Sequence, residues 1–329
     1  MRIGVLGRIF GKRDGKGGGP EAFVGAFGKH PAWNDHIEDI GLDTQRLVEA
    51  KRSLYVEGIG GNIDSGVWDS LDDKSRLEGF GHLFLWSQDD ECLIGRMWSS
   101  SDGKGRTKYP MMVVAHLRHA SRAAHAATVE ALIAAESACR STTERTGVID
   151  AVSKARDRIR ASLGVTADGR AQPSAESAPS FEGIIQSEVM GPNLTGVERV
   201  IYQIERDMGA YLRDSGSESG SSRMKSINLR PQHLRAPACI SDSWGSIEAW
   251  NAFMLDLVDE LCPLLVIRRD DAPWVELIVG APGPGELFCL RAGLAAVPAA
   301  TEVPYTIDAA LAARVREWIS SRQHAPVRL

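Results

Sequence analysis

Two nearly continuous apolar segments on either side of a short polar stretch are the clearest structural signal in the chain. Residues 91–98, ECLIGRMW, precede the stretch and residues 111–117, MMVVAHL, follow it. Ser100, Asp102, two glycines and three basic side chains are part of the stretch. Apolar runs bounded by turn-forming residues predict two buried β-strands joined by a tight polar loop. The apolar segment 82–87 comes just before and predicts a hairpin with the first of these strands.

Elsewhere the spacing of apolar residues predicts a mixture of helices and strands. A helix is expected to begin at Asp43 or Thr44 and to end at the glycines of 58–61. Residues 120–163 show two successive apolar faces at helical spacing, and Gly164 is expected to end the second helix. The same reasoning predicts strands at 24–27, 263–268, 274–280 and 287–293, and helices at 195–212, 246–261 and 308–319.

Segments of low complexity suggest how the chain is divided. We expect a flexible, basic, glycine-rich leader at 1–21 and a linker at 164–180. The main domain is predicted to span 22–163, and a second α+β region 181–329 with a flexible insert at 214–223. The pattern leaves open whether the carboxyl-terminal strands form a second sheet or complete the first.

Composition argues against a nucleic-acid-binding protein and against a membrane protein. The formal net charge of -5 argues against a protein that binds nucleic acid mainly through phosphate contacts. Five widely spaced cysteines, an odd number without a CxxC pair, are typical of reduced thiols. No apolar run has the length of a membrane span or a signal-peptide core. We therefore expect a cytoplasmic protein that binds no nucleic acid and spans no membrane. The sequence contains no nucleophile elbow, HExxH, dinucleotide-binding or kinase motif, and we expect neither a cofactor nor a metal.

The polar loop after residue 98 allows three interpretations. In a catalytic one, Lys104 and Arg106 hold a phosphate or carboxylate while Asp102 acts as the base. In a structural one, Asp102 accepts backbone N–H groups and pairs with Arg106. In the third, the basic loop binds an acidic or phosphorylated partner. We favour the last two, because neither an activated nucleophile nor a second carboxylate accompanies the loop.

A second polar cluster follows the predicted strand at 24–27. Its members His30, Asp35 and His36, with Lys29 beside them, offer the groups needed for metal binding or acid–base chemistry. The structural alternative is that Asp35 caps local backbone N–H groups while both histidines lie at a surface turn. We favour that alternative, and we keep a hydrolase or phosphate-processing enzyme built on both clusters as the second hypothesis.

These two stretches resemble the paired motifs of the TagF family of accessory proteins associated with type VI secretion. The first motif, G-x-x-GK-x-P-x-x-x-D, is matched by Gly25 followed by Gly28, Lys29, Pro31 and Asp35. The second, S-x-D-x-x-GR followed by an aromatic residue and proline, is matched by Ser100, Asp102, Gly105, Arg106, Tyr109 and Pro110. The chain differs in having Trp33 and Asn34 before the aspartate, His36 in place of a phenylalanine, and one more residue before the proline.

The resemblance implies a longin-like (profilin-like) α+β fold, an antiparallel sheet flanked by helices, here with a carboxyl-terminal α/β extension or second subdomain. It also implies a non-enzymatic cytoplasmic regulator, typically a repressor, that binds the forkhead-associated scaffold of a bacterial type VI secretion system. That scaffold works with a Ser/Thr kinase and a PP2C-type phosphatase, and sheath components are further candidate partners. A platform for a small GTPase is another hypothesis for a longin-like fold.

The resemblance suggests roles for the motif residues. We expect the glycines and prolines to shape two turns, and Asp35, Asp102 and Arg106 to tie the turns together. Lys29, Lys104 and Lys108 are then left exposed as candidate contacts to the partner.

Overall fold

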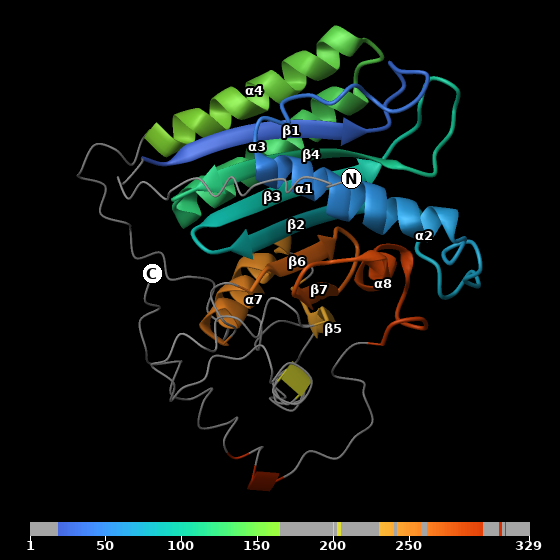
Figure 1. Cartoon of the computed structure of the whole chain (residues 1–329), viewed down its shortest axis with the longest axis vertical. Helices are drawn as coiled ribbons and strands as arrows, with labels where there is room; N and C mark the ends of the chain where they lie inside the picture. The colour runs from blue at the N-terminus through green and yellow to red at the C-terminus, as the bar shows by residue number, and fades with distance from the viewer. Residues whose placement is uncertain are drawn as a thin grey trace, which may run out of the picture.

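A single antiparallel sheet contains all the strands in the described part of the chain (Figure 1). In this computed structural model the order of the seven strands is β1-β4-β3-β2-β6-β7-β5. Their bounds are β1 Glu21–Gly28, β2 Gly81–Gln88, β3 Glu91–Ser99, β4 Pro110–Arg118, β5 Gln232–Pro237, β6 Leu264–Arg269 and β7 Trp274–Val279. The structure describes residues 19–164, 200, 203–204, 230–239, 242–257, 262–298, 309–310 and 313. An α+β fold with an antiparallel sheet is therefore confirmed.

The central strands are the ones that the sequence predicts best. β2 and β3 form the expected hairpin around Asp89 and Asp90, and Asp89 adopts the left-handed φ of 54° that the tight turn needs. β4 pairs with both β3 and β1. Eight of its nine residues are buried, which explains its nearly continuous apolar sequence: a strand alternates apolar and polar residues only when one face meets water.

Helices cover both faces of the sheet and divide the core into two layers (Figure 1). One face packs against α3 (Arg122–Arg140), α4 (Arg145–Gly164) and α7 (Ser243–Leu257). The other face packs against α1 (Gln45–Ala50), the π-helix η1 (Lys51–Gly60), α2 (Gly61–Asp64) and α8 (Pro284–Leu287). Within the described ranges, no helix is both long enough and apolar enough to cross a bilayer.

The first helical segment begins as predicted but ends later. The Thr44 hydroxyl accepts a hydrogen bond from the Leu47 N–H and caps α1. The glycines of 58–61 do not end the helix, which continues through η1 and α2. Gly58 instead allows close packing, because a Cβ there would lie 2.2 Å from Cδ1 of Leu287. Gly66, with φ +71°, follows the actual end.

The described carboxyl-terminal strands complete the first sheet rather than forming a second one. β6 pairs with β2 over six residue pairs, and β7 and β5 follow it. Strand β5 is absent from the sequence prediction. The predicted strand at 287–293 is wrong: Leu287 is the last residue of α8, and the 3₁₀ helix η5 (Phe288–Arg291) follows it. Glu286 accepts the Gly283 N–H at the start of α8.

Helix α7 begins three residues before the predicted Ser246. The carboxylate of Asp242 accepts the N–H of Gly245 at 2.7 Å and so satisfies one of the free donors at the helix start. The predicted apolar faces of the helices include three side chains that are exposed in the structure: Val48, Ile133 and Ile149 have exposed fractions of 43%, 50% and 44%.

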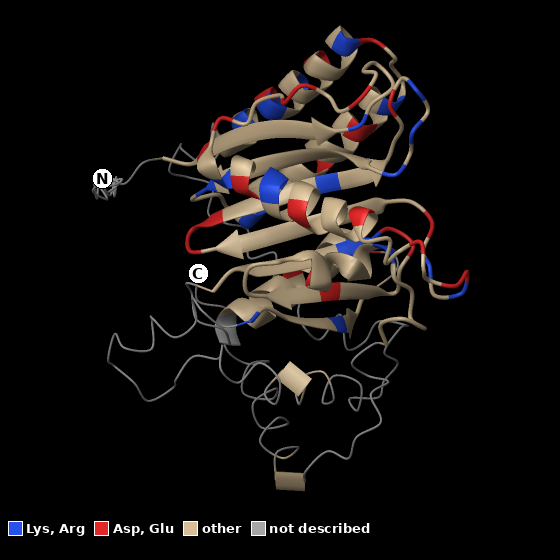
Figure 2. Ribbon diagram, turned by 45° about the vertical axis from the view of Figure 1, so that its right-hand side comes forward, with Lys and Arg blue, Asp and Glu red and all other residues tan. Residues whose placement is uncertain are grey.

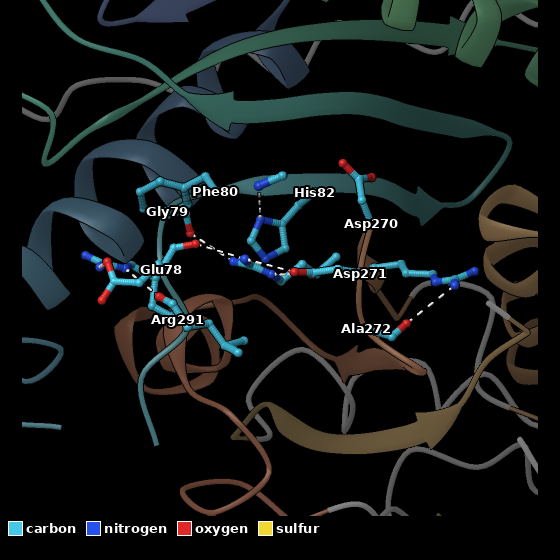
Figure 3. Close-up of polar contacts among 12 residues, drawn as sticks. Glu78, Gly79, Phe80, His82, Asp270, Asp271, Ala272 and Arg291 are labelled. Atoms are coloured by element: carbon cyan, nitrogen blue, oxygen red, sulfur yellow. Dashed lines mark hydrogen bonds and ion pairs between the residues drawn. The ribbon is translucent and has the colours of Figure 1, made fainter. Parts of the chain in front are cut away.

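Charged side chains hold strands β5, β6 and β7 against the part of the sheet formed by β1 to β4 (Figure 3). Arg269 donates to the carbonyls of Glu78 and Gly79 and pairs with Asp271. Arg96 of β3 makes a two-pronged pair with Asp270, with both N–O distances at 2.6 Å. The sheet is therefore held across the β2–β6 junction by side chains as well as by backbone pairing.

Several sequence predictions lie outside the described residues. These are the leader up to residue 18, the linker at 165–180, the insert at 214–223, most of the helix at 195–212 and most of the last helix. Of the helix at 195–212, the structure describes Val200 and Ile204, which are both buried in the layer that contains α3 and α4.

Acidification is expected to destabilise the junction through His82, a buried residue on β2. Burial first, and then the charges of Arg269 and Arg96, lower its pKa to about 3, against an ordinary value of 6.5. Below pH 6.5 the unfolded chain therefore binds a proton that the folded chain refuses, and stability is lost as the pH falls. Between pH 7 and about pH 5.5, His82 should remove about 1 kcal/mol from the free energy of unfolding.

Urea unfolding at both pH values measures this loss. His82→Asn should reduce the pH dependence of the free energy of unfolding by that amount. Identical pH dependence in His82→Asn and the wild type would contradict the assignment.

Candidate functional site

The two motif loops meet at one end of the sheet because of strand pairing. β1 runs antiparallel to β4, and Gly28 at the end of β1 lies opposite Met111 near the start of β4. The loop after β1 (residues 29–36) therefore lies beside the loop that precedes β4 (residues 100–109). We call these the first and second motif loops. The backbone also joins them, since the Gly103 N–H donates to the Trp33 carbonyl at 2.6 Å.

Asp102 is the centre of the contact between the loops. Its carboxylate is completely buried and accepts four hydrogen bonds. One oxygen accepts the backbone N–H groups of Lys104 and Arg106, which fixes the turn of the second motif loop. The other accepts Nζ of Lys29 at 2.5 Å and Nε of Arg106 at 2.6 Å. A buried carboxylate needs such compensation, because it has lost its hydration.

Arg106 extends the contact back to the first motif loop. Its Nη2 donates to the carbonyl oxygen of Asn34 at 2.9 Å and lies 3.2 Å from Oδ1 of Asp35. Lys29 also approaches Asp35, at 3.5 Å. The expectation that Asp35, Asp102 and Arg106 tie the turns together is thus met by the geometry, with Lys29 as a fourth member. We call these four residues the loop lock.

The motif glycines and Pro110 permit the close approach of the loops. A Cβ on Gly28 would lie 2.3 Å from the Pro110 carbonyl oxygen, which instead accepts the Lys29 N–H. Gly105 has φ +77° and closes the turn with a hydrogen bond to the Asp102 carbonyl. Pro31 starts the turn of the first motif loop. Ser100 is half-buried and, within the described residues, takes no part in the side-chain hydrogen bonds of the lock.

The lock fixes the ionisation of Asp102. Burial alone would raise its pKa, but the hydrogen bonds from Lys29, from Arg106 and from two backbone N–H groups outweigh burial and hold the pKa well below its ordinary value. A general base works best when its pKa lies near the operating pH. Asp102 therefore suits a structural anion better than the base of the second hypothesis.

The histidines of the first motif loop are separated. His30 is buried and contacts α3, where Nε2 lies 2.9 Å from the carbonyl oxygen of Cys139. Its Nδ1 accepts the Ala32 N–H, so Nε2 holds the proton and donates it to Cys139. His36 is half-exposed and contacts Asp35 at 3.1 Å. The three side chains of the proposed acid–base cluster therefore do not converge on one point.

The three lysines proposed as partner contacts have different environments. The prediction that Lys29 is exposed is wrong: its side chain is 5% exposed and binds Asp102. Lys104 and Lys108 are exposed as expected. Lys108 also pairs with Asp69 at 3.1 Å, where both side chains are more than 60% exposed.

Departures from the family motif have structural roles that sequence reasoning missed. The carbonyl groups of Trp33 and Asn34 accept hydrogen bonds from the second motif loop. His36 packs edge-on against Tyr55 and Tyr109, as a phenylalanine could. Hydrogen bonds to the backbone carbonyls of residues 33 and 34 cannot be predicted from side-chain identity. The packing role of His36 could have been predicted, because its ring replaces an aromatic residue of the motif.

Comparisons with known protein families, curated proteins and solved structures find no match to this chain. The two motif loops and the contacts between them are the features from which we infer a function.

Removing one partner of the buried pair should destabilise the chain strongly. Lys29→Met deletes the ammonium and keeps most of the side-chain volume, so Asp102 stays buried with one donor fewer. Removing one partner of a buried ion pair lowers stability strongly, because the remaining charge is left without compensation. We expect the midpoint of thermal unfolding to fall by roughly 10 °C. The matched control Lys108→Met breaks an exposed pair and should lower the midpoint by about 2 °C or less. If both substitutions lowered the midpoint equally, the buried pair would stabilise the fold no more than the exposed pair does.

Proposed function

We propose that this protein is a non-enzymatic adaptor of the TagF type, which regulates a bacterial type VI secretion system after translation and represses its assembly. In this proposal it binds the forkhead-associated scaffold that works with the kinase and the PP2C-type phosphatase. It acts in the cytoplasm on a longin-like platform. Sheath components are secondary candidate partners.

The loop lock is the single observation on which the proposal rests. The motif residues that an enzyme would use, above all Asp102 and Arg106, are engaged with each other and with Lys29. Their charges are balanced internally, so they hold two loops in one fixed arrangement. A rigid, preorganised surface lowers the entropic cost of binding a partner. This favours an adaptor over the hydrolase hypothesis.

The outer side of the second motif loop supplies candidate contacts. Residues 103–108 are all exposed, while Asp102 beneath them is buried. Lys104 and Lys108 project from this fixed turn, and the guanidinium of Arg106 is half-exposed beside them. Charged positions lie mainly on the loops and helices that border the sheet (Figure 2). A basic turn on a rigid base suits an acidic or phosphorylated surface.

Charge reversal on this turn should weaken binding to the scaffold. Isothermal titration of the full chain with the purified scaffold should show binding, and Lys104→Glu/Lys108→Glu should weaken it about tenfold or more, because two attractions become repulsions. The weakening should shrink as salt is raised. Circular dichroism should show that the wild type and the double variant are both folded.

A matched double reversal on α4, Lys154→Glu/Arg158→Glu, provides the control, because both side chains are exposed there. It should bind like the wild type. No binding by the wild type would contradict the proposed function. Wild-type binding that is unaffected by Lys104→Glu/Lys108→Glu would keep the adaptor and remove the loop from its interface.

A further inference from the structure

Three potential metal ligands converge far from the motif loops. They are His233 on β5, Glu276 on β7 and Cys289 on η5, and their ligand atoms all lie within 4.8 Å of one another. Nε2 of His233 lies 2.7 Å from Oε2 of Glu276. Glu276 and Cys289 are buried, whereas the His233 side chain keeps 16% of its surface exposed. The cluster is therefore protected but remains in reach of solvent.

The surroundings orient Glu276 through its other oxygen. Oε1 accepts Nε of Arg235 at 2.6 Å and Nε1 of Trp274 at 2.9 Å. Oε2 therefore faces His233. Hydrogen bonds that fix one carboxylate oxygen and direct the other are common around bound metals.

Arg235 itself is held in place by the segment that presents the cysteine. Its guanidinium is buried and donates to the carbonyls of Gly293 and Ala292, and to those of Cys289 and Val297. These carbonyls offset part of its positive charge. Arg235 therefore fixes η5 and the residues after it against the outer strands of the sheet, and so fixes the position of Cys289.

We propose that His233, Glu276 and Cys289 bind one divalent ion of the zinc class. One imidazole nitrogen, one carboxylate oxygen and one thiolate are the ligand types that zinc prefers, whereas magnesium and calcium prefer oxygen ligands alone. The Cys289 S–H bond breaks as the metal–sulfur bond forms, and the proton goes to water. Nε2 of His233 gives up its hydrogen bond to Glu276 and binds the metal. Its proton leaves to water while Nδ1 takes one up from water, so the ring stays neutral. Three protein ligands leave a fourth tetrahedral position for water.

The bound ion would join β5, β7 and η5, which Arg235 already connects. It lies at the β5 end of the sheet, whereas the loop lock lies at the β1 end, where β1 meets β4 (Figure 1). The metal proposal is therefore independent both of the adaptor proposal and of the hydrolase hypothesis, which is built on the motif loops. His233 and Glu276 are 43 residues apart in the sequence, which is why their spacing gave no metal signal.

Cobalt titration of the full chain, after dialysis against a chelator, tests the site. We expect one Co²⁺ per chain, with visible bands of a tetrahedral ion and a near-ultraviolet thiolate-to-cobalt charge-transfer band. Zn²⁺ should displace the cobalt, so that the visible bands and the charge-transfer band both disappear. Cys289→Ser should abolish the charge-transfer band, and Cys262→Ser, at another buried cysteine, should retain it.

A second variant keeps the test decisive if Cys289→Ser fails to fold. His233→Ala removes a partly exposed side chain, so the fold should persist by circular dichroism, and cobalt affinity should fall at least tenfold. Absence of stoichiometric Co²⁺ binding by the wild type would overturn the proposal. A charge-transfer band that persists in folded Cys289→Ser, or wild-type affinity in His233→Ala, would overturn it as well.

Discussion

The buried ion pair between Lys29 and Asp102 is the interaction on which the arrangement of the motif loops depends. A buried charge is tolerated only when it is paired and hydrogen-bonded. Each partner therefore requires the other, although 73 residues separate them in the sequence. Arg106 and Asp35 extend the pair at its exposed side. The result is a turn whose inner side is fixed and whose outer side, residues 103–108, is exposed.

The sheet explains why this pair can form. Pairing of β1 with β4 aligns the end of one strand with the start of the other, and helices on both faces bury most residues of these strands. The described carboxyl-terminal strands extend the same sheet through β2 and β6. A second polar network, built around Arg235 and Glu276, fastens the far edge. The network around Asp102 lies at the β1 edge of the sheet, and the network around Glu276 lies at the β5 edge.

Local patterns predicted the parts of the fold that depend on neighbouring residues. The hairpin of β2 and β3, strand β4 and the Thr44 cap all follow from short stretches of sequence. Strand β5 was missed because its six residues contain only two apolar side chains before the proline, Leu234 and Ala236, which is too short an alternation to identify a strand. Strand 287–293 was predicted wrongly, because an apolar run of that length fits a buried helical turn equally well.

The candidate site was predictable only in part, for a similar reason. The sequence suggested that Asp35, Asp102 and Arg106 join two turns, since these types pair readily. It placed Lys29 on the surface, because a lysine between glycine and histidine in a turn has the local signature of an exposed residue. Its burial follows from Asp102, which no local pattern connects to it. Partners that are distant in sequence decide burial, and only the fold reveals them.

A side-chain carboxyl titration of Asp102 by nuclear magnetic resonance tests the central claim most directly. The account predicts that Asp102 stays ionised as the pH falls through its ordinary value of 3.8, for as long as the chain remains folded. Lys29→Met should raise the pKa of Asp102, because it removes the ammonium donor. An Asp102 resonance that titrates at or above 3.8 in the folded wild type would show that the loops are not held by this buried charge.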